Sequence, residues 1–314
     1  MGIFLNALIL IALFFVLGLS ADLAVKNIKY IALSLKIKVF VLGAILGIAT
    51  TLPELSVGIN TAMKDISGLS AGNILGGITV IMGLITGVSL ILHKNINTED
   101  NLKSLIPVLI VILSPFLLGT DGVFLLVDGL IMVALYLVLI FYLYKTSPSE
   151  TAPQESIVIL EKRKITKALF ISLIAIIVVI FSSNLIVEIS SGLLEKTGIS
   201  KLILGILVFS VGTNLPEITI ALTSFKRKAS ELSISFLISS AFTNIFALGL
   251  LAIFKPITFQ VNLAYYVLAF FIALIMILFV IFAFSDKKLS RREGFVLLGL
   301  YLIFLAINIF LAGR

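Results

Sequence analysis

The stretch TTLPE, Thr50–Glu54, stands in the middle of a run, residues 38–62, that is otherwise apolar enough to cross a membrane. A second stretch, TNLPE, Thr213–Glu217, stands in the run 202–224. A proline inside a helix lacks the backbone N–H and breaks the ladder of helical hydrogen bonds. A glutamate at the centre of a bilayer costs about 3 kcal/mol or more, so its presence there indicates a function. The two stretches predict broken helices that carry an intramembrane site.

The composition of the whole chain is that of an integral membrane protein. Of its 314 residues, 60% are hydrophobic and 12% are charged, whereas soluble domains are about half apolar. Several apolar runs exceed about 18 residues, the length of a membrane-spanning helix, and they do not alternate as the strands of a β-barrel do. The chain contains no cysteine, which excludes disulfides and thiol chemistry. We expect an all-α membrane protein.

Ten transmembrane helices are predicted. They cover residues 3–24, 38–62, 70–92, 104–120, 122–144, 166–192, 202–224, 232–254, 261–284 and 294–311. Residues 146–164 are polar, contain two prolines and end in a basic cluster, which is typical of a linker. The chain is therefore predicted to consist of a first five-helix repeat (1–145), the linker (146–164) and a second five-helix repeat (165–314).

The positive charges favour one orientation in the membrane. If the ten spans alternate, eighteen of the 23 Lys and Arg residues fall on one side of the membrane and five on the other. The five are Lys64, Lys196, Lys201, Lys255 and Arg314. Basic loops stay in the cytoplasm, so we expect a plasma-membrane protein with both termini outside and the 146–164 linker inside. Because the net charge of +7 is spread over these short loops, it does not indicate nucleic-acid binding.

The two TxLPE stretches also define an internal repeat. Aligning Glu54 with Glu217, an offset of 163 residues, places Thr50 on Thr213. Because each half has an odd number of spans, the halves are expected to enter the membrane from opposite sides. The sequence therefore predicts an inverted-topology repeat in which helices two and seven are broken, as in many secondary transporters.

The residues around the two breaks are rich in oxygen. They are Thr50, Thr51, Glu54, Thr213, Asn214 and Glu217. Carboxylate, hydroxyl and carbonyl oxygens are the ligands of hard cations, and Ca²⁺ takes six to eight of them. A single buried glutamate in a kinked helix can be merely structural. Two at equivalent positions of an inverted repeat favour an ion-binding site.

The spans that follow the breaks add small and polar residues. Gly72, Gly76 and Gly77 lie at helical spacing in the third span and predict a close approach between helices. In the eighth span, the polar residues are Ser240, Thr243 and Asn244. They are candidates to line a polar pathway, and ordinary hydrogen bonding between helices is an equal alternative for each one.

These motifs resemble the calcium/cation antiporter superfamily, and most closely its sodium/calcium exchangers. The resemblance rests on GIATTLPELSVGI (47–59), SVGTNLPEITIAL (210–222) and GTDGVFLLVDG (119–129). It implies that Ca²⁺ is bound near the membrane midplane by Glu54, Glu217, Thr50 and Thr213, with backbone carbonyls near Gly47 and Ser210 completing the shell.

The positions that hold sodium in this family are less well kept. Sodium exchangers have serine at the positions of Thr51 and Asn214. They have a hydroxyl side chain at the position of Gly77, where it is lost here, and at that of Ser240, where it is kept. They have Asn and Asp at the positions of Ile81 and Asn244. Asn214 gives the chain some resemblance to proton/calcium exchangers. Two carboxylates balance one Ca²⁺, two Na⁺ or two H⁺, so an electroneutral 2:1 exchange is our hypothesis.

The resemblance implies a secondary antiporter, functional as a monomer in the lipid bilayer, that exchanges Ca²⁺ for Na⁺. Exchange for H⁺ is the alternative, and no cofactor is expected. A passive cation channel would use the same oxygens but is more often built from identical subunits, and single-channel currents would identify it. Because the sequence lacks the HExxH and GxSxG motifs, we do not expect an enzyme.

Overall fold

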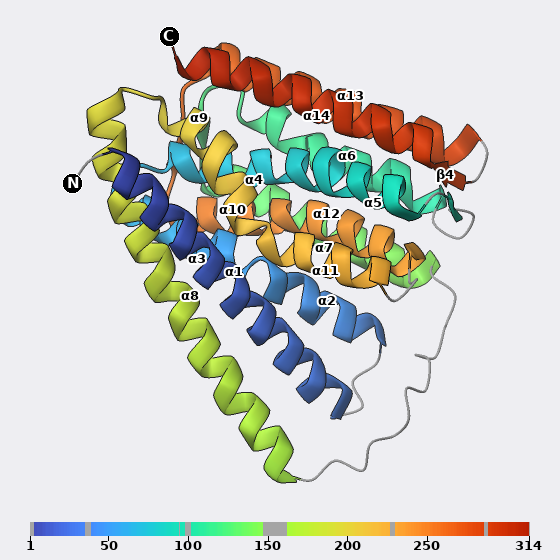
Figure 1. The fold of residues 1–314 in the computed structure, drawn as a ribbon. Helices are drawn as coiled ribbons and strands as arrows, with labels where there is room; N and C mark the ends of the chain where they lie inside the picture. The colour runs from blue at the N-terminus through green and yellow to red at the C-terminus, as the bar shows by residue number, and fades with distance from the viewer. Residues whose placement is uncertain are drawn as a thin grey trace.

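Helices make up almost all of the structure, a computed structural model that describes residues 3–34, 39–93, 95–97, 102–146, 162–226, 230–285 and 288–313 (Figure 1). The first half of the chain contains α1 (Ile3–Ser34), α2 (Val39–Thr50), α3 (Leu52–Met63), α4 (Gly68–Thr79), the π-helical segment η1 (Val80–Ile85), α5 (Thr86–His93), α6 (Leu102–Leu118) and α7 (Leu126–Thr146). The second half contains α8 (Lys162–Thr197), α9 (Lys201–Leu204), the π-helical segment η3 (Gly205–Phe209), α10 (Ser210–Thr213), α11 (Leu215–Lys226), α12 (Ser230–Phe254), α13 (Leu263–Ser285) and α14 (Arg291–Ala312).

Seven helical segments among the described residues are long and apolar enough to cross a membrane. They are Phe4–Ala32, Gly68–Leu92, Leu126–Thr146, Lys164–Thr197, Phe236–Phe254, Leu263–Ser285 and Arg291–Ala312. The pair Lys201–Thr213 and Leu215–Leu222 forms one further span if the two are taken together, bent by 41° at the TNLPE stretch. The chain is therefore an all-helical, multi-pass membrane protein, and the count of ten spans stays a prediction.

Some of the predicted boundaries are wrong. The span predicted to end at residue 24 continues as α1 to Ser34, and the span predicted over 166–192 extends as α8 from Lys162 to Thr197. The apolar run of α1 stops at Asp22, but the helix continues, and an i,i+4 ion pair of 2.5 Å between Asp22 and Lys26 supports its next turn. The linker is also shorter than predicted, because residues 146 and 162–164 are helical; residues 147–161 lie outside the described part of the chain.

Two short antiparallel strand pairs join connections from the two halves. β1 (Asn95–Asn97) pairs with β4 (Lys288–Ser290), and β2 (Val123–Phe124) pairs with β3 (Ile257–Thr258). Backbone hydrogen bonds between the paired strands therefore connect a loop of the first half to a loop of the second.

The core of the molecule surrounds α4. Every residue of α4 is buried, and the helix packs against η3, α9, α10 and α12. The long helices α1 and α8 pack along each other at one side of the molecule (Figure 1). Their outward side chains, such as Phe15 and Phe170, are apolar and exposed, as expected for a face toward lipid.

Candidate ion-binding site

Both TxLPE stretches break a helix at the predicted place. α2 ends at Thr50 and α3 begins at Leu52, while α10 ends at Thr213 and α11 begins at Leu215. Each proline thus falls in the first turn of a new helix, where its missing N–H leaves no bond unmade. Each glutamate also lies in that first turn. The positive end of the helix dipole there favours a carboxylate.

Backbone carbonyl groups beside the breaks accept hydrogen bonds from nearby side chains. The Thr50 hydroxyl donates to the Gly47 carbonyl at 2.9 Å, and the Thr51 hydroxyl donates to the Ile48 carbonyl at 2.9 Å. In the second half, Nδ2 of Asn214 donates to the Ser210 carbonyl at 2.7 Å. A carbonyl oxygen accepts two hydrogen bonds, so the predicted ligands at Gly47 and Ser210 keep acceptor capacity.

The two carboxylates lie close together inside the protein. Glu54 and Glu217 are each 1% exposed. They are near enough to interact electrostatically, and the side chain of Thr213 faces Glu54. The Ser240 hydroxyl donates to Oε1 of Glu217 at 2.9 Å, whereas Oε2 of each glutamate is buried and finds no hydrogen-bond partner among the described residues. Buried anionic oxygens are costly without a positive partner, so the pair is suited to hold cations or protons.

Residues of α12 complete the surroundings of the two breaks. A Cβ atom at Gly77 would lie 2.9 Å from Nδ2 of Asn214 and 3.3 Å from Nδ2 of Asn244, so the two amides fill the place of a side chain at residue 77. A Cβ atom at Gly47 would lie 3.2 Å from the Thr243 hydroxyl. The structure therefore brings the polar residues of α12 against both broken helices. The Thr51 hydroxyl instead donates to the Ile48 carbonyl of the helix that precedes it.

One residue at the site was missed by the sequence analysis. The Thr213 hydroxyl lies 3.0 Å from Oδ1 of Asn73 in α4, and 3.1 Å from the Phe209 carbonyl. Asn73 is fully buried. An asparagine in an apolar span is a recognisable signal, because polar groups are rare there. The glycines around it indicate close helix packing, which hides this signal. That packing prediction is confirmed, since Gly72 meets Leu202 and Gly205.

The π-helical segments were also unpredicted. η3 directly precedes Ser210, and η1 contains Ile81, so each widened turn adjoins the site. The Thr86 hydroxyl donates to the carbonyl of Ile81, five residues back, at 2.8 Å. Such widened turns occur mostly in single stretches near functional sites.

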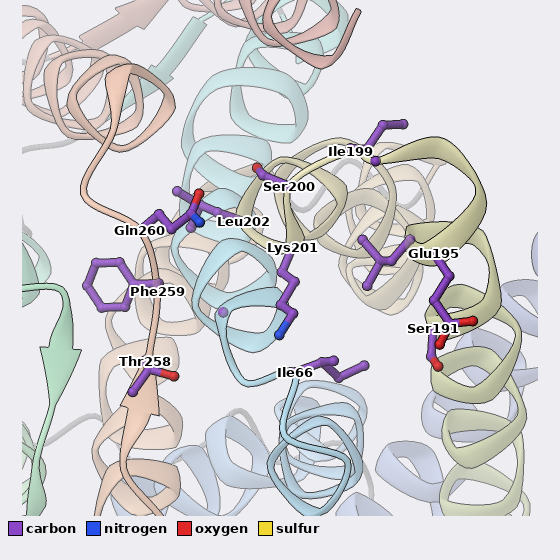
Figure 2. A pocket seen from close by; sticks show the side chains of 13 residues that line it. Ile66, Ser191, Glu195, Ile199, Ser200, Lys201, Leu202, Thr258, Phe259 and Gln260 are labelled. Atoms are coloured by element: carbon purple, nitrogen blue, oxygen red, sulfur yellow. The ribbon is translucent and has the colours of Figure 1, made fainter. Parts of the chain in front are cut away.

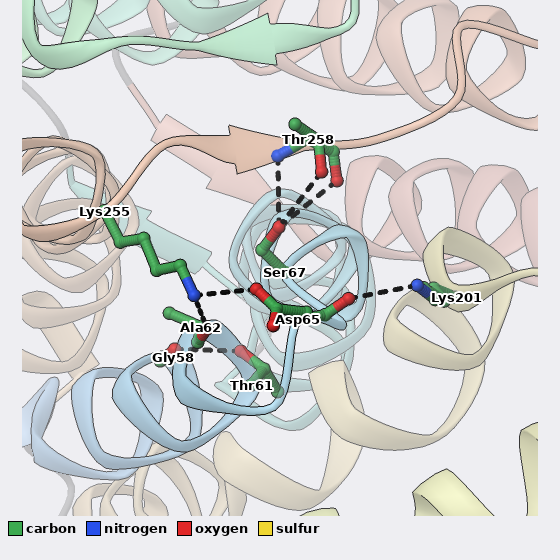
Figure 3. A network of polar contacts seen from close by, with 8 residues as sticks. All are labelled: Gly58, Thr61, Ala62, Asp65, Ser67, Lys201, Lys255 and Thr258. Atoms are coloured by element: carbon green, nitrogen blue, oxygen red, sulfur yellow. Dashed lines mark hydrogen bonds and ion pairs between the residues drawn. The ribbon is translucent and has the colours of Figure 1, made fainter.

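A second polar cluster lies at the end of α3, away from the glutamates. Nζ of Lys255 donates to the Ala62 carbonyl at 2.8 Å and to Oδ1 of Asp65 at 2.7 Å, and Lys201 donates to the Asp65 carbonyl at 3.2 Å (Figure 3). The hydrogen bond and the charge of Lys255 lower the pKa of Asp65. This cluster fastens the turn between α3 and α4 to the second half of the chain.

A pocket of about 640 Å³ lies beside this cluster. Glu195 at the end of α8, Lys201 at the start of α9 and Gln260 after β3 are among the side chains around it (Figure 2). It is lined by helix ends and loops, so it is distinct from the carboxylate pair.

The donor set of the carboxylate pair suits a hard cation that is held and released. Within the described ranges, no group of three or more His, Cys, Asp and Glu side chains is placed to hold a metal ion. Two carboxylates with hydroxyl, amide and carbonyl oxygens are the ligands of Ca²⁺ or Na⁺, whereas transition metals prefer imidazole and thiolate.

Known proteins resemble the chain over nearly its whole length. An uncharacterized membrane protein of Methanocaldococcus jannaschii is 26% identical over 302 residues, which are 93% of this chain and 96% of that protein. The sodium/calcium exchanger MaX1 of Methanosarcina acetivorans is 25% identical over 359 residues, covering 96% and 98%.

Two kinds of solved structure share the fold. Structures of the sodium–calcium exchanger NCX_Mj match with a TM-score of 0.67 at 23% identity, covering 97% of this chain and 99% of that one. The H⁺/Ca²⁺ exchanger CAX matches with a TM-score of 0.74 at 18% identity, covering 96% and 86%. At these identities the likeness establishes the fold alone.

The family is given by a profile match in two segments. Residues 5–145 and 167–310 match the family described as sodium/calcium exchanger protein. The match covers far more than half of the chain and agrees with the resemblance carried by the two TxLPE stretches. The chain belongs to the sodium/calcium exchanger protein family.

Proposed function

We propose that this protein is a secondary antiporter that exchanges Ca²⁺ for Na⁺ at the pair Glu54 and Glu217. The observation that carries the proposal is the pair itself: two buried carboxylates from two broken helices, close enough to interact, each with an unpartnered oxygen. One Ca²⁺ neutralises both charges, and so do two monovalent cations. Competition for the same two carboxylates makes binding of one ion expel the other, which is the basis of exchange.

The proposed Ca²⁺ ligands are Glu54, Glu217, Thr50 and Thr213, with the carbonyls of Gly47 and Ser210. Thr51, Asn214, Ser240 and Asn244 are proposed to serve the counter-ions. Asn214 supports this role, because its Nδ2 is bound to the Ser210 carbonyl while its Oδ1 is buried and unpartnered. Ser240 supports it too, because its hydroxyl touches Glu217 directly.

The proposed architecture is ten spans in two inverted repeats, 1–145 and 165–314. Three features at the offset of 163 residues support it. α2 ends at Thr50 and α10 ends at the equivalent Thr213. α3 and α11 begin two residues later in each half, and their last residues, Met63 and Lys226, are equivalent too. The strand pairs lie at similar places as well, since β1 moved by this offset overlaps β3 at Thr258, and β2 moved by it falls directly before β4.

We propose that α1 and α8, the equivalent first helices of each repeat, move against the rest to open the site to either side. Their position supports this role, because they pack on each other at the edge of the molecule and contact α3 and α11, the second parts of the broken helices. Both termini are proposed to lie outside a plasma membrane, and the monomer is the proposed working unit.

Proton exchange is the second candidate, and the surroundings of Gly77 favour it. The two amide nitrogens there are hydrogen-bond donors, which repel Na⁺, and Ile81, four residues after Gly77, is apolar and buried. A proton needs only the carboxylate itself, whereas Na⁺ needs several oxygens. Na⁺ remains our first choice because Ser240 and the Oδ1 atom of Asn214 supply oxygens at the second break.

Uptake of ⁴⁵Ca²⁺ into proteoliposomes tests the proposal. An outward Na⁺ gradient is expected to drive uptake, and an outward H⁺ gradient of equal size to drive less. A 2:1 exchange moves no net charge, so an imposed membrane potential is expected to leave the rate unchanged. Uptake with no counter-ion gradient that persists at the driven rate indicates a channel instead.

The same assay tests the two glutamates. Glu54→Gln or Glu217→Gln removes half of the binding charge from a buried site, so uptake is expected to fall about 100-fold or more. Glu195→Gln is the matched control, because Glu195 is exposed at the end of α8 and should transport as the native protein does. Full activity in both intramembrane variants would refute the site.

A further inference from the structure

We propose that Asn73 is a positioning residue for the cation site. Its side-chain oxygen accepts a hydrogen bond from the Thr213 hydroxyl, which leaves the lone pairs of the Thr213 oxygen facing the bound ion. The inference rests on the proposed function, since it assumes that Thr213 binds the cation. It adds a residue from α4 to a site otherwise built from the broken helices and α12.

The geometry places the carbonyl oxygen of Asn73 within hydrogen-bond distance of the Thr213 hydroxyl. Oδ1 of Asn73 lies 3.0 Å from the Thr213 hydroxyl, and both residues are fully buried. The close contact between Gly72 and Gly205 holds α4 against the turn that leads to Thr213. Within the described part of the chain the Nδ2 atom of Asn73 has no partner, so the hydrogen bond from Thr213 and the packing of α4 hold the amide in place.

The need for an acceptor follows from counting protons. A threonine hydroxyl has one proton and two lone pairs. The Thr213 side chain also faces Glu54, so without a cation its proton can point to that carboxylate. A cation held by both Glu54 and Thr213 repels a proton placed between them. The proton must then point to the Asn73 oxygen or the Phe209 carbonyl, 3.0 and 3.1 Å away.

The two halves of the protein solve this problem differently. Thr50, the counterpart of Thr213, donates to the Gly47 carbonyl within its own helix. The position that the 163-residue offset aligns with Asn73 is Phe236, which has no acceptor. Among the described residues, a side chain from another helix thus orients the second-half threonine and not the first-half one, and this asymmetry provides an internal control.

The test is a set of double variants in proteoliposomes made with the full chain. Asn73→Leu and Asn73→Asp are measured in the native background, and Asn73→Leu also in the Thr213→Val and Thr50→Val backgrounds. The measured quantities are the half-saturating Ca²⁺ concentration and the maximal rate. Thr79→Val is the matched control, because Thr79 is a buried residue of α4 whose hydroxyl has no partner in the part of the chain that the structure describes.

Asn73→Leu is expected to raise the half-saturating Ca²⁺ concentration about 2- to 12-fold, the value of one hydrogen bond, with a nearly unchanged maximal rate. Asn73→Asp retains the acceptor oxygen and is expected not to raise it. In the Thr213→Val background, Asn73→Leu should add nothing, because the hydroxyl that it orients is gone. In the Thr50→Val background it should keep its full effect.

Additive effects of Asn73→Leu and Thr213→Val would overturn the inference, and so would an unchanged half-saturation in Asn73→Leu. Failure of the proposed site is a separate result, since Thr213→Val alone would then bind Ca²⁺ as the native protein does. A variant that fails to fold shows itself by loss of the monodisperse peak, and Asn73→Ala, which removes the acceptor oxygen without adding bulk, then carries the comparison with Thr213→Val.

Discussion

Ser240 fixes one of the two carboxylates of the site. Its hydroxyl donates to Oε1 of Glu217 at 2.9 Å, and both side chains are buried. A hydrogen bond to a charged group contributes about 1.5–3 kcal/mol, more than one between neutral groups. The bond holds one oxygen of Glu217 and leaves the other available to an ion.

We therefore expect Ser240→Ala to weaken Ca²⁺ binding about tenfold or more, because the freed carboxylate loses its orientation and a charge-assisted hydrogen bond. The half-saturating Ca²⁺ concentration of uptake measures the change. Ser114→Ala is the control, since the buried Ser114 hydroxyl bonds the Val111 carbonyl of its own helix at 2.8 Å. Equal effects of the two substitutions would show that Ser240 has no special role.

At the scale of single residues, the sequence predicted which oxygen-bearing residues form the candidate site better than it predicted which residues contact one another. Glu54, Glu217 and the threonines were recognisable because each carries oxygen inside an apolar run. Asn73 was not, because its partner Thr213 lies 140 residues away in the chain. The amides of Asn214 and Asn244 likewise occupy the space beside Gly77 because of how separate helices pack together. No local sequence pattern predicts that packing.

Among the elements, α4 is the one on which the packing of the site depends. A Cβ atom at Gly72 would fall on the backbone carbonyl of Leu202, and one at Gly205 would fall on that of Leu69. Backbone atoms cannot turn away as side chains do. The two glycines therefore allow α4 and the π-helical segment η3 to touch, as small residues do between membrane helices.

Gly72→Ala is accordingly expected to destabilise the protein by about 1–3 kcal/mol through overpacking. Gly192→Ala in α8 is the matched control, because a Cβ there has no neighbour within 4 Å. Alanine also favours a helix over glycine by about 0.5–1 kcal/mol. Thermal unfolding in detergent should show a lower midpoint for the first variant and an equal or higher one for the second. The reverse order would contradict the packing described for α4.

The broken helices could be predicted from sequence because proline acts locally, on the turn that contains it. The π-helical segments could not, because a bond to the fifth residue back is selected by neighbours such as the η3–α4 contact. The lengths of α1 and α8 were underestimated for a related reason. Hydropathy marks where a helix leaves the hydrocarbon, not where its backbone bonds end.

The orientation of the whole molecule stays a prediction from the distribution of Lys and Arg, and it is open to a direct test. Because the chain contains no cysteine, single cysteines report on one position each. Lys196→Cys, at the exposed end of α8, is expected to react with a membrane-impermeant maleimide on intact cells. Ser156→Cys in the linker should react only after the membrane is opened. Labelling in the opposite order would place both termini inside.

The length of α1 and α8 has a consequence for the membrane around the protein. The candidate spans Phe4–Ala32 of α1 and Lys164–Thr197 of α8 contain 29 and 34 residues, roughly 44 and 51 Å of helix at the usual rise, against a hydrocarbon layer of about 30 Å. Helices of this length reach beyond the hydrocarbon or cross it at a tilt, and the pair runs at a clear angle to α13 and α14 (Figure 1). Tilt follows bilayer thickness. The acyl-chain length of the surrounding phospholipids is therefore expected to bias the inclination of the two helices that we propose to move, within the range that their packing on the rest of the protein allows.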